Sequence, residues 1–79
     1  MDRFEAMSIL IDVVDSGSFS ATARRLRVPL TTIARKISNL EMLLGAELLI
    51  RTTRKLTLTD AGATYVAAAR RIHDARGRW

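Results

Sequence analysis

Threonine, asparagine and arginine side chains gather on one side of the segment 26–41, which reads LRVPLTTIARKISNLE. A helix turns by about 100° per residue, so a helix here places one set of apolar residues on a single stripe: Ile33, Ile37, Leu40 and Leu44. The opposite side and its flank carry hydroxyl, amide and cationic groups: Thr31, Thr32, Arg35, Lys36, Ser38 and Asn39. A helix that only meets solvent more often mixes Glu and Lys at a spacing of four. The outward face therefore indicates a binding partner.

The chemistry of this face suits the base edges of double-stranded DNA. The major groove is about 12 Å wide and admits one α-helix. A helix entering by its N-terminal half would present the following residues: Leu30, Thr31, Thr32, Ala34, Arg35 and Lys36. Arg35 suits the bidentate contact with guanine, and the threonines suit bases or a thymine methyl group. The alternative is that Arg35 and Lys36 are ordinary solvated cations.

A second group of cations, Arg51, Arg54 and Lys55, lies in the segment LLIRTTRKLTLT. The apolar period changes there from about 3.6 to about 2 residues, which predicts two short strands around a turn at 52–54. Cations at such a hairpin suit contact with phosphates or the minor groove. Cations also protect edge strands from aggregation. Both interpretations stay open for Lys55, and DNA contact is favoured for Arg54.

The net charge of +5 is unevenly distributed along the 79 residues. Residues 1–23 hold one cation against four acids, whereas residues 24–55 hold eight cations against two acids. A basic patch of this kind is the electrostatic footprint expected of a protein that binds a polyanion.

Several classes of function lack support in the sequence. There is no cysteine, and His73 is the only histidine, which excludes disulfides and leaves no residue set for a metal site. No nucleophile and base pattern, phosphate-binding glycine loop or paired carboxylates point to catalysis. No apolar run approaches the roughly 18 residues of a membrane span, and no secretory signal is visible. We expect a non-enzyme without cofactor or small-molecule ligand in these residues, located in the cytoplasm and on the nucleoid when bound.

Local signals divide the chain into four helices and a hairpin. Apolar residues at helical spacing predict a first helix over 2–15, and Ser18 is placed to cap a second helix that runs to about Arg27. Pro29 lies at or just before the first position of the third helix, Gly45 ends that helix, and Thr59 caps the fourth. The short 27–29 connection favours a steep crossing of two helices, and the hairpin follows as a wing. The prediction is a mainly α winged helix-turn-helix over 1–59, with a linker and dimerisation helix over 60–79.

The fourth helix carries apolar residues that a small domain has little need to cover. One stripe, interrupted by Arg76, is predicted to form a homodimer interface: Tyr65, Ala69, Ile72 and Trp79. Tyr65 is also expected to contribute to the domain core. Gly62 in the first turn lowers helix propensity and therefore predicts close packing by a neighbouring element. The alternative is a frayed end with an incidental tryptophan.

Two stretches, GSFSATARRL and ISNLEMLLGAELLIRTTRKLTLTDAG, resemble the N-terminal DNA-binding domain of LysR-type transcriptional regulators. The resemblance covers nearly the whole chain from Phe4 onward. It implies that the third helix reads the major groove and that the wing touches the backbone or minor groove. It also implies that the fourth helix pairs two domains. By resemblance, Arg35 falls on the usual arginine that contacts bases or phosphates, and Arg54 falls on the usual wing arginine.

The chain departs from the family where base reading is expected. The family commonly begins its third helix with Ser-Gln-Pro and places Ser before the arginine, where this chain has Pro29, Leu30, Thr31 and Ala34. Apolar groups therefore replace two polar ones, which predicts more reliance on thymine methyl contact and DNA shape. The wing also lacks the family's usual glycine.

We expect a homodimer that binds an inverted repeat in double-stranded DNA. The alternative is a winged-helix module for protein or RNA contact. The cationic wing together with Arg35 favours DNA, because the major groove of A-form RNA is too narrow for the third helix.

Overall fold

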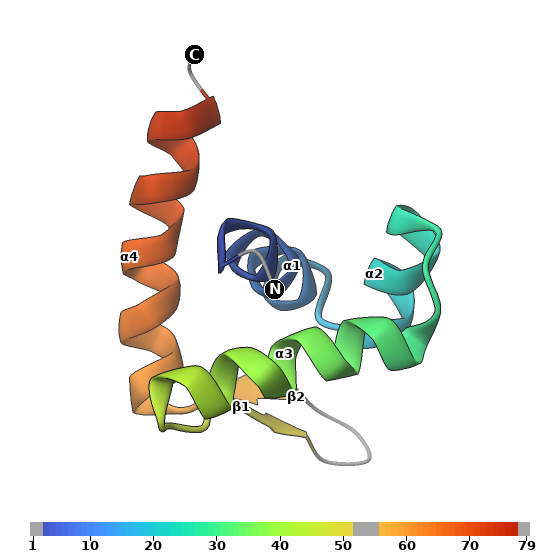
Figure 1. The fold of residues 1–79 in the computed structure, drawn as a ribbon, viewed down its shortest axis with the longest axis horizontal. Helices are drawn as coiled ribbons and strands as arrows, with labels where there is room; N and C mark the ends of the chain where they lie inside the picture. The colour runs from blue at the N-terminus through green and yellow to red at the C-terminus, as the bar shows by residue number, and fades with distance from the viewer. Residues whose placement is uncertain (1–2, 52–55, 78–79) are drawn as a thin grey trace.

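The computed structural model describes residues 3–51 and 56–77, which form four helices and one two-stranded antiparallel sheet (Figure 1). In chain order the elements are α1 (Arg3–Ser16), α2 (Phe19–Leu26), α3 (Leu30–Leu44), β1 (Leu49–Arg51), β2 (Leu56–Leu58) and α4 (Asp60–Gly77). The predicted winged helix-turn-helix is confirmed, and the predicted helix limits hold to within one or two residues.

The connection between α2 and α3 is set by local capping. The Ser18 hydroxyl oxygen accepts the Ala21 N–H at 3.2 Å and begins α2. Arg27 ends α2 in the left-handed conformation, with φ at 59°, and is the only non-glycine residue with positive φ in the described part of the chain. Pro29 then stands as the N-cap of α3. This tight connection lets α3 leave α2 at a steep angle, as Figure 1 shows on its right.

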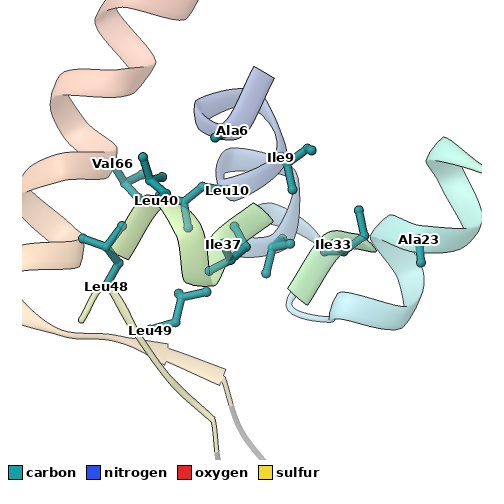
Figure 2. Close-up of a cluster of buried hydrophobic side chains, with 11 residues drawn as sticks. Ala6, Ile9, Leu10, Ala23, Ile33, Ile37, Leu40, Leu48, Leu49 and Val66 are labelled. Atoms are coloured by element: carbon teal, nitrogen blue, oxygen red, sulfur yellow. The ribbon is translucent and has the colours of Figure 1, made fainter. Parts of the chain in front are cut away.

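The core is built around α1, which lies between the other three helices (Figure 1). Its buried Leu10 and Val13 belong to the same cluster as Ile33 and Leu40 of α3 and Val66 of α4 (Figure 2). Three of the four residues on the predicted α3 stripe are therefore buried.

Leu44 is the exception on that stripe, because its side chain is 38% exposed. The helix ends there, and Gly45 takes a φ of 70° and turns the chain toward the sheet. Leu44 is left at the mouth of a surface hollow instead of under α1, so its predicted burial is wrong.

The start of α4 is held against the segment before β1. The Thr59 hydroxyl accepts the Gly62 N–H at 2.9 Å and donates to the Glu47 carbonyl at 2.6 Å. A Cβ atom on Gly62 would lie 2.0 Å from the Leu48 carbonyl oxygen, so no larger residue fits without a backbone shift. The predicted Thr59 cap and the predicted close packing at Gly62 are both confirmed.

Candidate nucleic-acid interface

The outward face of α3 lies opposite the buried stripe of Ile33, Ile37 and Leu40. Thr31, Arg35, Ser38 and Asn39 are all exposed, and Leu30 at the N-terminal end is 46% exposed. Pro29 is the N-cap of α3, and its side chain forms no hydrogen bond with the N–H groups at this end of the helix. The structure thus presents hydroxyl, cationic and apolar groups together along one side of a single helix.

Three of the predicted contact residues lie on the flanks of this face instead of its centre. Ala34 is half-buried and lines a shallow pocket with Phe19 and Leu49, on the side of the sheet. Thr32 and Lys36 are half-buried on the other side, in a groove that α3 shares with α1 and α2. Leu30, Thr31 and Arg35 are consequently the most accessible of the α3 set.

Lys36 has a partner on α1. Its ammonium group forms an ion pair with the Glu5 carboxylate of α1, and its side chain is only 29% exposed. The flank position of Lys36 directs it toward α1, which approaches α3 on this side. Lys36 therefore pairs with an exposed acid of α1, and its predicted DNA contact stays a prediction.

Acids of α1 pair with one cation from each of the other helices in the described part of the chain. Besides Glu5 with Lys36, Asp12 pairs with Arg25 of α2, and Asp15 pairs with Arg70 of α4 at 2.5 Å. The hydrogen bond from Arg70 lowers the pKa of Asp15, and the same bond raises the pKa of Arg70.

The pairing changes the electrostatic picture of the basic middle third. Arg25 and Lys36 each form an ion pair with an acid of α1, whereas Arg24, Arg27 and Arg35 are exposed and have no ion pair within residues 3–51 and 56–77. Arg35 is thus the free cation on the α3 face.

The wing is anchored to α3 by Glu41. Its carboxylate accepts the backbone N–H of Leu48 at 2.7 Å and of Leu49 at 3.3 Å, where the chain enters β1. The strands pair with Leu49 opposite Leu58 and Arg51 opposite Leu56. Arg54 and Lys55 lie outside the described residues, and Arg51 is placed as the last residue of β1. Sequence reasoning missed the Glu41 anchor, because an acid eight positions before a strand gives little signal.

The predicted interface stripe on α4 is partly wrong. Ala69 is fully buried with Met7 and Ile11 of α1, because α4 packs its Val66 and Ala69 side on the domain. Tyr65 is half-buried and packs against the core, as expected. Ile72 is 47% exposed, and Trp79 lies outside the described residues.

Residues 4–63 match the family model of bacterial regulatory helix-turn-helix proteins of the lysR family. The chain belongs to this family. It is 52% identical over 64 residues to an HTH-type transcriptional regulator of Xanthomonas campestris, covering 81% of this chain and 19% of that protein. It is 44% identical over 68 residues to the regulator CrgA of Neisseria meningitidis, covering 86% of this chain and 23% of that protein. This LysR-family chain therefore spans about a fifth of the length of these curated relatives, which are named as transcriptional regulators.

Solved structures share the fold over almost the whole chain. The DNA-binding domain of CbnR in complex with DNA has a TM-score of 0.89 and 38% identity, over 99% of this chain and 88% of that one. The BenM DNA-binding domain in complex with catB site 1 DNA has a TM-score of 0.91 and 27% identity, over 99% and 86%. The LysR-family chain is accordingly a winged helix-turn-helix domain.

Residues 3–51 and 56–77 contain neither a membrane-spanning helix nor a cluster of metal ligands. No helix among them is both long and apolar enough to cross a membrane. No group of three or more His, Cys, Asp or Glu side chains within those residues could hold a metal ion.

Proposed function

We propose that this LysR-family domain binds double-stranded DNA sequence-specifically, with α3 in the major groove and the wing on the backbone or minor groove. The observation that carries the proposal is the exposed face of α3, where Arg35 keeps a free guanidinium group beside Thr31 and Leu30. The structures of two similar domains with DNA support this placement.

The residues take different parts in this binding. Arg35 reads a guanine by a bidentate contact. Leu30, Thr31, Thr32 and Ala34 meet base edges and thymine methyl groups, with Thr32 and Ala34 at the margins of the contact. Arg51, Arg54 and Lys55 of the hairpin contact phosphates or the minor groove, which positions the domain but carries no sequence information directly.

The domain acts as a homodimer on an inverted repeat. The helix α4 packs its Val66 and Ala69 side on the domain and leaves Ile72 exposed, so it is the natural site of pairing. Two domains joined in this way set their α3 helices in successive major grooves, about one helical turn apart. In this proposal, residues 1–59 form the part of the chain that reads DNA, and residues 60–79 form the helix that links the two copies. We also infer a cytoplasmic location, with nucleoid association when DNA is bound.

Selection of binding sites from a random duplex pool tests the proposal. The expected result is an enriched inverted repeat whose half-sites lie about one helical turn apart. Binding that falls steeply with salt but enriches no sequence would show that the domain only grips the backbone. The major groove of A-form RNA is too narrow for α3, so duplex RNA should not compete with DNA that is bound through α3. Equal competition by duplex RNA would therefore favour the alternative of an RNA-binding winged helix.

A further inference from the structure

The connection between α2 and α3 holds a residue type that its backbone conformation disfavours. Arg27 has a φ of 59°, which no other non-glycine residue within 3–51 and 56–77 matches with a positive value. Glycine takes this conformation without a clash of a Cβ atom, whereas an arginine is strained there. A strained position that keeps a large side chain points to a function of that side chain. The fold alone gives no reason for an arginine here.

Two common structural roles do not account for the guanidinium group of Arg27. Cations at the C-terminal end of a helix interact favourably with the helix dipole, but Arg24 and Arg25 already lie in the last turn of α2. An ion pair is the second role. Asp12 pairs with Arg25, whereas Arg27 is exposed and pairs with no acid in the described part of the chain.

Arg27 lies on the side of α3 that is opposite the wing. Its chain neighbours Leu26 and Val28 line a groove together with Thr32 and Lys36 of α3. The other side of α3 meets β1. Figure 1 shows the same arrangement, with the C-terminal end of α2 above α3 and the hairpin below it. The exposed face of α3 therefore lies between the hairpin and the end of α2.

A helix in the major groove of DNA has a phosphate backbone on each side, because the two strands form the two borders of the groove. The hairpin cations are proposed for one border. On the other side of α3, Arg25 and Lys36 are paired with acids of α1. Arg24 and Arg27 remain exposed there, and the Arg27 N–H donates to the Arg24 carbonyl at 3.3 Å, so the two residues are adjacent.

We infer that Arg27, together with Arg24, contacts the phosphate backbone on the border of the major groove that faces away from the wing. This inference rests on the proposed DNA binding and adds a second phosphate contact to it. The helix α3 is then held from both sides, since the wing contacts one strand and the two arginines contact the other. A guanidinium group suits this contact, because its planar donors can bind two phosphate oxygens at once.

Two variants at position 27 separate the charge from the backbone strain. Arg27→Gly removes both, whereas Arg27→Gln removes the charge and keeps a Cβ atom. Each variant should bind the selected duplex about threefold to tenfold more weakly at physiological salt. Each should also lower the slope of log affinity against log salt concentration by about one. The base preference should stay unchanged, because a phosphate contact carries no sequence information directly.

Urea unfolding of the same proteins separates binding from folding. Arg27→Gly should have a higher urea midpoint than the parent, because glycine relieves the strain. A weaker affinity in a more stable protein does not arise from misfolding.

The matched control removes a guanidinium group from the last turn of α2 without changing the net charge. Arg25→Gln/Asp12→Asn deletes the ion pair with α1 and should keep the affinity and the salt slope of the parent. Ethylation interference on the selected duplex locates the contact, with Arg54→Ala identifying the phosphates at the wing. Phosphates on the opposite border should matter to the parent and to the control, but not to Arg27→Gly.

The outcomes distinguish this inference from the proposed function. Parent-like slopes in both Arg27 variants, with an inverted repeat still selected, would overturn the inference and leave the DNA-reading proposal standing. A lower slope in both variants, with no enriched sequence, would support the phosphate contact and count against sequence reading. A loss confined to Arg27→Gly, or an equal loss in the control, would overturn the role of the Arg27 charge. A parent that binds no duplex would overturn both proposals.

Discussion

Arg27 shows how a single backbone conformation limits the choice of residue. It occupies the left-handed region with φ at 59°, a conformation that costs an ordinary residue about 1 kcal/mol relative to glycine. Its N–H nevertheless donates to the Arg24 carbonyl at 3.3 Å, and the Val28 N–H donates to Ala23 at 3.1 Å, which closes α2. Sequence reasoning placed the end of α2 correctly but gave no sign of a strained conformation, since no glycine marks it.

Arg27→Gly should therefore raise the free energy of unfolding by about 0.5 to 1 kcal/mol. The reason is that glycine adopts positive φ without a Cβ clash. Urea unfolding measures the change as a higher midpoint at constant slope. Arg24→Gly is the control within α2, and it should lower stability by about 1 kcal/mol. A lower midpoint for Arg27→Gly would contradict this account of the turn.

Leu30 and Ala34 are apolar residues near Arg35, which is the proposed base-reading residue. Leu30→Gln and Ala34→Ser add hydrogen-bonding groups next to the bases. We expect the selected half-site to change at one or two positions near the guanine that Arg35 contacts. Repeating the site selection with each variant measures this change. An unchanged site in both selections would remove these two residues from base reading.

At the scale of elements, the wing depends on one carboxylate of α3. The Glu41 carboxylate accepts two backbone N–H groups at the entry to β1, those of Leu48 and Leu49. Glu41→Ala should destabilise the domain by about 1 to 3 kcal/mol, because these part-buried donors lose their acceptor. Glu41→Gln keeps an acceptor oxygen and should cost less. Equal urea midpoints for Glu41→Ala and the parent would show that the anchor contributes nothing.

The packing of α4 on α1 includes the exposed ion pair of Asp15 with Arg70. The folded state lowers the pKa of Asp15, so the pair stabilises the domain above the unfolded pKa near 4 and loses this contribution as the pH falls through the folded pKa. Asp15→Asn should remove that part of the pH dependence, with a loss of at most about 1 kcal/mol at neutral pH. Urea midpoints compared at pH 7 and pH 3 test it. An equally steep loss of stability in the variant would exclude Asp15 as a source.

At the scale of the whole molecule, the order of elements could be predicted because its signals are local. Ser18, Gly45 and Thr59 determine where helices begin or end through bonds to residues only a few positions away. The differences from prediction at Leu44 and Ala69 have a common cause. In both cases, burial depends on which side of the helix is covered by another element. That side is set by the positions of α1 and α4 in the folded domain.

For the candidate site too, local features could be predicted from the sequence, whereas contacts between distant residues could not. The position of Arg35 follows from helical periodicity alone, because the buried stripe of Ile33 and Ile37 leaves it on the outside. The pairing of Lys36 with Glu5 does not follow, since the two residues lie 31 positions apart. Two cations of the middle third, Arg25 and Lys36, thus pair with acids of α1, which composition alone does not show.

The most direct test of sequence-specific reading by α3 is an affinity profile of three proteins. The parent, Arg35→Ala and Lys36→Ala are titrated against the selected duplex and its single base-pair variants at one salt concentration. We predict that replacement of one guanine costs the parent and Lys36→Ala about 1 to 3 kcal/mol, whereas Arg35→Ala binds both duplexes alike. The opposite pattern, with the guanine preference lost in Lys36→Ala and kept in Arg35→Ala, would contradict the account.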